Sequence, residues 1–221
     1  MVLGHGPKVV TDGLVLALDA ADRNSYPGSG TTWTDLSGNG NNGTLVNGVG
    51  YNGSNGGSLS FDGVDDYISF STSSSLQFGT GNFSIDFIFK FNSITVNQYF
   101  FDFGTNNLVL QYYQSGSGYV LRYLTQTTQI KDTTYTLNTN IFYNLTVVRN
   151  SGTGYLYLNS NQISSWSDSG NYTSNSLDIF RYGGRSFYTN GNLYNFKIYN
   201  RALTSSEIRQ NFNALRGRFG I

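Results

Sequence analysis

Very few side chains in this sequence could act in acid–base or nucleophilic catalysis. The 221 residues include no cysteine, one histidine (His5) and one glutamate (Glu207). A cysteine nucleophile and a Cys-ligated zinc site are therefore excluded, and we expect neither a Ser-His-Asp triad nor a multi-histidine metal site. Asp65 and Asp66 are adjacent, so on a strand they would point to opposite faces. Retaining glycoside hydrolysis needs two carboxyl groups about 5 Å apart, and we therefore predict no catalytic residue and no enzyme.

Aspartates and asparagines in glycine-rich turns are the candidate metal ligands. Ca²⁺ takes six to eight oxygen ligands from carboxylates, amide side chains and backbone carbonyls. The alternative is that these side chains hydrogen-bond their own turns, as Asp and Asn commonly do. The sequence requires no cofactor and leaves a structural Ca²⁺ open. The candidate ligands are Asp35, Asn39, Asn41, Asp62, Asp65 and Asp66.

Exposed aromatic rings are the candidate contacts for sugars, because a sugar ring stacks on an aromatic ring while polar groups around it bind the hydroxyls. The alternative is that tyrosines pair across strands and stabilise a sheet without any ligand. Trp33 is expected to be a core anchor instead. The candidate sugar-binding residues are Trp166, Tyr112, Tyr113, Arg185 and Tyr188.

Charge and composition exclude several classes of partner. Thirteen basic residues balance thirteen acidic ones, and only 12% of the chain is charged. A neutral chain without a basic block is not expected to bind nucleic acid or an anionic membrane surface. No apolar run approaches the ~20 residues of a membrane-spanning helix. Aromatic residues make up 16% of the chain, which indicates a folded protein with a substantial core.

Short alternating runs separated by Gly, Asn and Ser predict an all-β protein that positions these side chains. In the longest run, Phe83, Phe87 and Phe91 share one parity and should face the core, whereas Ile88 interrupts the otherwise polar parity. Such an exception fits a strand that is covered on both faces. The predicted strands are 14–18, 58–61, 67–70, 82–91, 99–103, 107–113, 119–124, 141–149, 154–158 and 192–199.

One helix is predicted near the C-terminus. Thr204 and Glu207 have the spacing of a capping box, in which each side chain accepts a hydrogen bond from the other residue's backbone N–H. An apolar stripe follows at Ile208, Phe212 and Leu215. We expect the helix to lie as a lid over an open end of the β-structure. Beyond it, Phe219 and Ile221 would form an apolar tail. We expect this tail to contact the domain's own open edge, a sister subunit or the lattice of a larger assembly, and to contribute to assembly.

Four ordered segments carry a resemblance to a known family: LVLALDA (residues 14–20), WTDLSGNGNNGTL (33–45), SLSFDGVDDYI (58–68) and IYNRALT (198–204). In this order they resemble the concanavalin A-like lectin/glucanase superfamily, in its laminin-G-like branch. The resemblance implies a jelly-roll sandwich of two antiparallel sheets with one short C-terminal helix. The domain would span residues 13–215, between an N-terminal arm (1–12) and a C-terminal tail (216–221). The branch usually carries an acidic pair where this chain has Tyr194 and Asn195, which would weaken a calcium site.

Three further segments resemble stand-alone proteins of this branch found in tailed phages: GPKVVTDG (6–13), SYPGSGTTW (25–33) and QNFNALRGRFG (210–220). The resemblance implies a non-enzymatic virion surface protein that decorates or cements the capsid, with glycan binding as an added role. Its partners would be a capsid or other virion protein and further copies of itself. No secretory signal is visible, so we expect synthesis in the host cytoplasm. The alternatives are a receptor-binding lectin of a tail fibre or cell surface and, more remotely, a glycanase.

Overall fold

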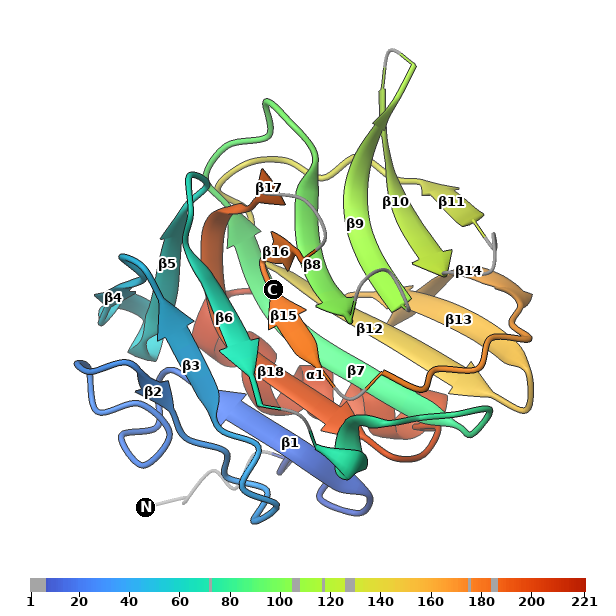
Figure 1. The fold of residues 1–221 in the computed structure, drawn as a ribbon, viewed down its shortest axis with the longest axis horizontal. Helices are drawn as coiled ribbons and strands as arrows, with labels where there is room; N and C mark the ends of the chain where they lie inside the picture. Colours follow the sequence, from blue (N-terminus) through green and yellow to red (C-terminus); the bar gives the residue numbers. More distant parts are fainter. Residues whose placement is uncertain are drawn as a thin grey trace.

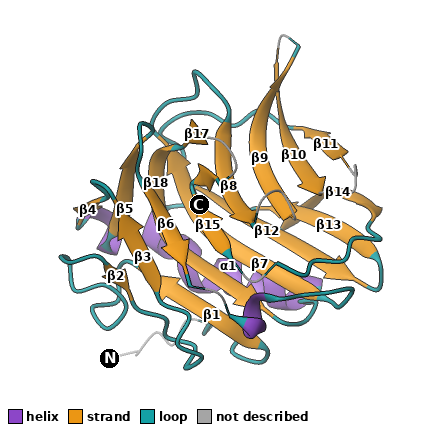
Figure 2. Ribbon diagram, viewed as in Figure 1, coloured by secondary structure: helices purple, strands orange, loops and turns teal. Residues whose placement is uncertain are grey.

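The computed structural model of the chain describes residues 7–71, 73–104, 108–116, 118–125, 130–174, 176–183 and 187–221. Two antiparallel sheets face each other in a sandwich, and one helix covers the back of one of them (Figure 1). Figure 2 shows that most of the regular secondary structure is β-strand. The predicted fold class is confirmed. None of the described helices is long and apolar enough to cross a membrane.

Sheet A has its strands in the order β14, β13, β12, β7, β18, β5 and β4, and β1 also pairs with β18. Strand β18 can hold two neighbours on one side because β5 pairs with its first half and β1 with its second. The strands of sheet A are β1 (Leu14–Asp19), β4 (Gly50–Asn52), β5 (Ser58–Asp62), β7 (Phe83–Phe91), β12 (Tyr143–Asn150), β13 (Thr153–Leu158), β14 (Asn161–Ser167) and β18 (Asn190–Tyr199).

Sheet B has the order β11, β10, β9, β8, β15, β6, β3 and β2. A small hairpin of β16 (Arg181–Tyr182) and β17 (Phe187–Tyr188) packs against β8, and two short 3-10 helices, η1 (Ser54–Gly56) and η2 (Ser74–Leu76), lie in connections. The strands of sheet B are β2 (Thr32–Trp33), β3 (Gly43–Val46), β6 (Tyr67–Phe70), β8 (Gln98–Phe103), β9 (Leu108–Ser115), β10 (Gly118–Thr125), β11 (Ile130–Thr134) and β15 (Leu177–Ile179).

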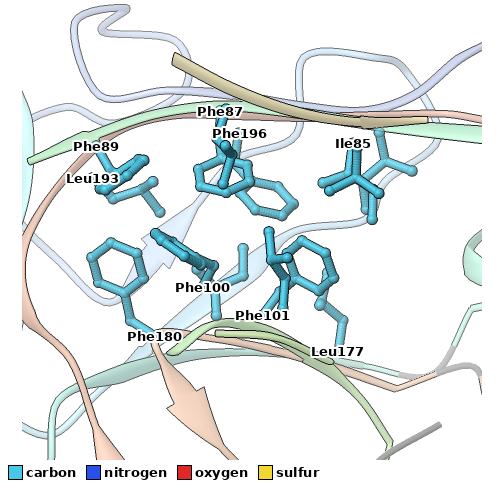
Figure 3. Packing of buried hydrophobic residues seen from close by; sticks show 14 of the residues in the cluster. Ile85, Phe87, Phe89, Phe100, Phe101, Leu177, Phe180, Leu193 and Phe196 are labelled. Carbon is cyan, nitrogen blue, oxygen red and sulfur yellow. The ribbon is translucent and has the colours of Figure 1, made fainter. Parts of the chain in front are cut away.

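The core between the sheets is built largely from aromatic rings. Phe87 of β7 lies against Phe100, Phe101 and Phe196, with ring centroids 5.3–6.2 Å apart. Figure 3 shows these rings meeting from the two sheets. The residues of β7 with the parity of Phe87 are all buried, as the alternation predicts. Trp33 is fully buried and is the core anchor expected from the sequence.

Helix α1 (Ser205–Phe219) covers the outer face of sheet A, so its predicted place over an open end of the sandwich is wrong. Ile208 packs with Val148 and Tyr199 of that face, and Phe219 packs with Ile88. Figures 1 and 2 show the helix behind the sheet. The helix needs an apolar surface, and the outward-facing Ile88 supplies part of it, which explains why this residue interrupts the polar parity of β7.

A polar cluster lies buried between sheet A and the helix. The Asp86 carboxylate accepts hydrogen bonds from Asn144 (2.7 Å) and Thr146 (3.0 Å) and pairs with the Lys197 ammonium at 3.2 Å. From the helix, the Asn211 side-chain amide lies 3.5 Å from the same carboxylate. The outer face of sheet A is therefore polar at its centre, and its charges are compensated within the chain.

The N-terminal segment and the C-terminal helix lie against each other on this outer face. Val10 N–H donates to the Asn211 side chain (2.8 Å), and the Tyr199 hydroxyl donates to the Val10 carbonyl (3.1 Å). The helix continues to Phe219, so most of the tail expected at 216–221 is its last turn. Phe219 is only 6% exposed, and it packs within its own domain rather than projecting as a free tail.

Candidate functional site

An open pocket of about 310 Å³ lies at the edge of the sandwich where four segments meet. One wall comes from the β5–β6 turn, another from the β7–β8 loop, and the others from the end of β9 and from β17 (Figure 1). We call it the Phe187 pocket. Its lining residues are Gly63, Val64, Val96, Asn97, Gln114, Phe187 and Tyr188.

Phe187 is unusual among the aromatic residues because its side chain is 49% exposed. It pairs with Tyr182 across the small hairpin, and both rings stack in parallel with Tyr99 of β8, at 6.0 Å and 5.2 Å between centroids. This stacking holds the hairpin against sheet B. Phe187 therefore has a fixed position while much of its surface faces solvent.

Tyr188, the second aromatic residue of the pocket, is held by a separate group of side chains. Its ring lies 6.1 Å from that of Tyr67, and the Arg181 guanidinium lies 4.4 Å from the Tyr67 ring centroid. Arg181 also pairs with Asp178 at 3.4 Å. Burial raises the pKa of the Asp178 carboxyl, and the charge of Arg181 partly opposes that rise.

Two amide side chains provide the polar side of the pocket. The Asn97 side-chain oxygen accepts a hydrogen bond from the Gln114 backbone N–H at 2.8 Å, which links the β7–β8 loop to the end of β9. The Gln114 side chain is exposed. Amide groups both donate and accept hydrogen bonds. This side of the pocket can therefore bind a hydroxyl group either as its donor or as its acceptor.

The β5–β6 turn is shaped by its own aspartates. Gly63 has a φ of 82°, which favours glycine, and the Val64 N–H donates to the Asp62 carboxylate at 2.7 Å. The Asp66 carboxylate, 3% exposed, accepts from the backbone N–H groups of Gly48 (2.7 Å) and Asp62 (3.1 Å). Burial raises the pKa of the Asp66 carboxyl, against the lowering effect of these two hydrogen bonds.

The six candidate calcium ligands fall into two groups at opposite ends of β3. Asp62, Asp65 and Asp66 come together, with carboxylate oxygens within 4.8 Å of one another. Both oxygens of Asp66 and one oxygen of Asp62 already accept backbone hydrogen bonds. The other Asp62 oxygen and the two of Asp65 would therefore supply at most half of the six to eight ligands that Ca²⁺ takes. This group fits a calcium ion only if water completes the coordination shell.

Asp35, Asn39 and Asn41 form the other group and serve their own loop. The Asp35 carboxylate accepts from the backbone N–H groups of Ala17 (2.9 Å), Ser37 (2.8 Å) and Asn41 (3.0 Å). The Asn39 side chain donates to Ser37, and the Asn41 side chain donates to the Val15 carbonyl at 2.8 Å. These side chains tie the loop to β1, which is the alternative role that the sequence left open.

The candidate sugar contacts are dispersed over the molecule. Tyr188 lies in the Phe187 pocket, and Arg185 lies outside the described residues. Tyr113 lies elsewhere, under the guanidinium of Arg122 at 3.8 Å from its ring centroid, and Arg122 is paired with Asp132.

Tyr112 and Trp166 pack within the protein. Tyr112 is 2% exposed, and its hydroxyl accepts from the Leu137 N–H at 3.0 Å, so it is a core residue and cannot stack on a sugar. Trp166 of β14 is half-buried, 4.6 Å from the Tyr123 ring, and lies over Gly154, where any side chain would clash with it. Both side chains, Tyr112 and Trp166, therefore contribute to packing within the protein.

Sequence reasoning did not identify Phe187, Asn97 and Gln114 as site residues. Neither a motif nor a spacing sets them apart, because they come from three distant segments. The sole signal was a phenylalanine between polar neighbours, Ser186 and Tyr188.

Sequence reasoning also missed a pair of aspartates. Asp102 of β8 and Asp178 of β15 stand opposite each other in sheet B. Together with Gly104, Ser176 and Gly183 they line a small pocket of about 140 Å³. The Gly183 N–H donates to Asp102 at 2.9 Å. This arrangement brings two carboxyl groups together on neighbouring strands, although they are far apart in the sequence.

A sequence model described as the concanavalin A-like lectin/glucanases superfamily matches residues 61–209, more than half of the chain. A search of curated proteins found no match.

Several solved structures share the fold at low sequence identity. A Trypanosoma rangeli sialidase in complex with the inhibitor DANA is 18% identical, with a TM-score of 0.70 over 96% of this chain and 34% of its own. The binding domain of Paraclostridial Mosquitocidal Protein 1 is 20% identical, with a TM-score of 0.72 over 92% of this chain and 52% of its own. The chain thus spans between a third and about half of these two structures.

A further structure matches over nearly its whole length. Domain 4 of AbnA, an extracellular GH43 arabinanase from Geobacillus stearothermophilus, was solved in complex with arabinotriose. It is 15% identical, with a TM-score of 0.70 over 90% of this chain and 98% of its own.

Proposed function

Since this chain belongs to the concanavalin A-like lectin/glucanases superfamily, we propose that it is a carbohydrate-binding protein and that the Phe187 pocket holds the glycan. The observation that carries the proposal is the half-exposed Phe187 ring beside the amides of Asn97 and Gln114. Ligand pockets combine apolar and aromatic walls with a few placed polar groups. An aromatic ring can stack on the apolar face of a sugar while the amides bind its hydroxyl groups.

The fold likeness is consistent with this proposal. The AbnA domain has the same fold, matches this chain over nearly its whole length, and was solved in complex with arabinotriose. We expect glycan binding at the Phe187 pocket to be independent of calcium, because no carboxylate is among the described residues that line it. A structural Ca²⁺, if one is bound, would be held at Asp62, Asp65 and Asp66.

A glycan array tests the proposal, with Phe187→Ala as the decisive variant. We expect the wild-type protein to bind a defined set of glycans, in EGTA as well as in Ca²⁺, and Phe187→Ala to bind them at least tenfold more weakly because a stacking surface is lost. The matched control is Tyr135→Ala, which removes another exposed aromatic side chain outside the pocket. Equal binding by the wild-type protein and Phe187→Ala would refute the assignment of this pocket.

We propose that the protein binds glycans without cleaving them. The glycanase alternative has one specific observation in its favour, the opposed Asp102 and Asp178. Reducing-sugar release from the glycans identified on the array distinguishes the two. We expect none, whereas release that disappears in Asp178→Asn would establish the enzyme.

We further propose that the domain is displayed on a phage virion, as a capsid decoration protein or as a tail-fibre lectin, and that it assembles with copies of itself. The resemblance of its terminal segments to phage proteins supports this proposal. Helix α1 and the Val10 segment lie on the outer face of sheet A, whereas no residue of either lines the Phe187 pocket. Attachment through that face would leave the pocket free, and side-chain-resolution density on purified virions would test it.

A further inference from the structure

The Phe187 pocket gathers the most exposed apolar side chains of the molecule. Among the large apolar residues in the described part of the chain, Val64 and Val96 have the two largest exposed fractions, 70% and 60%. Val64 comes from the β5–β6 turn and Val96 from the β7–β8 loop, yet both line this pocket together with Phe187. Single exposed apolar residues are normal on a protein surface, whereas several gathered at one pocket indicate a binding site.

Neither valine side chain is needed to hold its own loop in shape. The β5–β6 turn depends on the positive φ of Gly63 and on the Val64 backbone N–H, which donates to the Asp62 carboxylate at 2.7 Å. In the β7–β8 loop, the Val96 carbonyl accepts from the Gln98 side chain at 2.9 Å. Neither valine belongs to a hydrophobic cluster found among the described residues. Turns usually carry polar side chains, so both valines are available to a ligand.

The dimensions of this surface fit a small ligand better than a protein. A volume of about 310 Å³ lies at the lower end of the range for ligand pockets. Its apolar part consists of Val64, Val96 and Phe187, whereas a stable protein interface takes about 20–30 residues from each partner. The amides of Asn97 and Gln114 interrupt the apolar surface and provide hydrogen-bonding groups beside it. A sugar with an apolar substituent matches this combination.

From this arrangement we infer that the Phe187 pocket selects sugars that present a methyl group, and that Val64 and Val96 receive this group. The inference rests on the proposed function and specifies its ligand class. Aliphatic side chains offer no hydrogen bond, so a sugar hydroxyl placed against them loses its bonds to water. A methyl group in the same place is stabilised by burial. Two kinds of sugar carry such a group: 6-deoxyhexoses at C5 of the ring, and N-acetylhexosamines on the acetamido substituent.

The test uses an array of terminal sugars printed in matched pairs on a common linker. One kind of pair sets a 6-deoxyhexose against its parent hexose, and the other sets an N-acetylhexosamine against its N-formyl analogue, which keeps the amide but lacks the methyl group. Both kinds are printed in the gluco, galacto and manno configurations. We expect the methyl-bearing member of one kind of pair to bind about fourfold more tightly, as for one buried methyl group. The pair that shows the preference identifies the source of the methyl group.

Val64→Thr and Val96→Thr locate the methyl preference on the protein. Threonine keeps the branched shape of valine and replaces one methyl group by a hydroxyl, so each variant should reduce the preference about twofold or more. Binding of the methyl-free sugars should not change, and thermal unfolding should show the same Tm as the wild-type protein because both positions are exposed. The matched control is Ile141→Thr, at a side chain that is 47% exposed and does not line the pocket.

The outcomes separate this inference from the proposed function. Pairs that bind equally with and without the methyl group, and lose that binding in Phe187→Ala, would overturn the methyl preference and leave the proposed function intact. A preference that persists in full in both Val64→Thr and Val96→Thr would also overturn the inference, because the methyl group would then be bound elsewhere. If binding of no sugar in any form depends on Phe187, the proposed function itself fails.

Discussion

At the scale of single residues, Glu207 is the clearest case of a side chain whose role can be read from its partners. Its carboxylate accepts hydrogen bonds from the Thr204 backbone N–H (2.8 Å) and from Arg201 (2.7 and 3.0 Å). Arg201, and then Thr204, lower the pKa of this carboxyl to about 2. The one glutamate of the chain therefore caps a helix, as its spacing predicts.

Glu207→Ala should lower the free energy of unfolding by roughly 0.5–2 kcal/mol at pH 7, as expected for the loss of a helix cap. Because the folded-state pKa is lowered, the carboxylate stabilises the fold above pH 4.5, and this contribution is lost as the pH falls toward about 2. Urea denaturation at pH 7 and at pH 2.5 should therefore show the wild-type and variant stabilities converging at the lower pH. If the wild-type protein and Glu207→Ala differed in unfolding free energy by the same amount at both pH values, the role of the Glu207 charge would be refuted. The control is Arg209→Ala, at an exposed position of the same helix.

At the scale of elements, the C-terminal helix is an integral layer of the fold. Phe219, in its last turn, has its ring 5.2 Å from that of Phe142 and 5.0 Å from that of Tyr194. The N-terminal segment is attached to the middle of this helix, because the Asn211 side chain binds the Val10 backbone. Removal of residues 217–221 would expose this cluster, so these residues belong to the folded domain.

Phe219→Ala should lower the free energy of unfolding by about 3 kcal/mol, because a buried ring is lost and a cavity remains. Chemical denaturation measures the change, and Asn213→Ala, at an exposed position earlier in the same helix, should leave the stability unchanged. Equal stability of Phe219→Ala and the wild-type protein would mean that the last turn is not docked.

At the scale of the whole molecule, the two outer faces of the sandwich have different roles. Sheet A is covered by the helix and by the N-terminal segment, which bury its polar centre around Asp86 and Lys197. Sheet B carries the small hairpin and, at one edge, the Phe187 pocket. The layered core fixes both faces, since Phe87 and its neighbours are fully buried between the sheets. The stacking of Phe187 on Tyr99 of β8 connects the pocket to this framework, an arrangement that suits binding.

The amino-acid sequence by itself determined the fold class, the core parity of β7 and the capped helix. All three depend on local patterns: alternation places Phe83, Phe87 and Phe91 on one face, and the Thr204–Glu207 spacing starts a helix. The strands that the sequence did not predict include β11 and β14, which are edge strands with polar side chains. These two strands form because their backbones hydrogen-bond to a neighbouring strand. Their own residue patterns do not predict a strand.

Only the tertiary structure decided which polar and aromatic residues form a site. Tyr112 and Tyr113 are adjacent and chemically alike, yet the first is buried in the core and the second lies on the opposite face of sheet B. Phe187, Asn97 and Val64 meet because three distant connections end at one edge of the sandwich. Alternation tells which residues share a face but not what covers that face. The position of helix α1 and the composition of the Phe187 pocket therefore depend on long-range packing that no local pattern encodes.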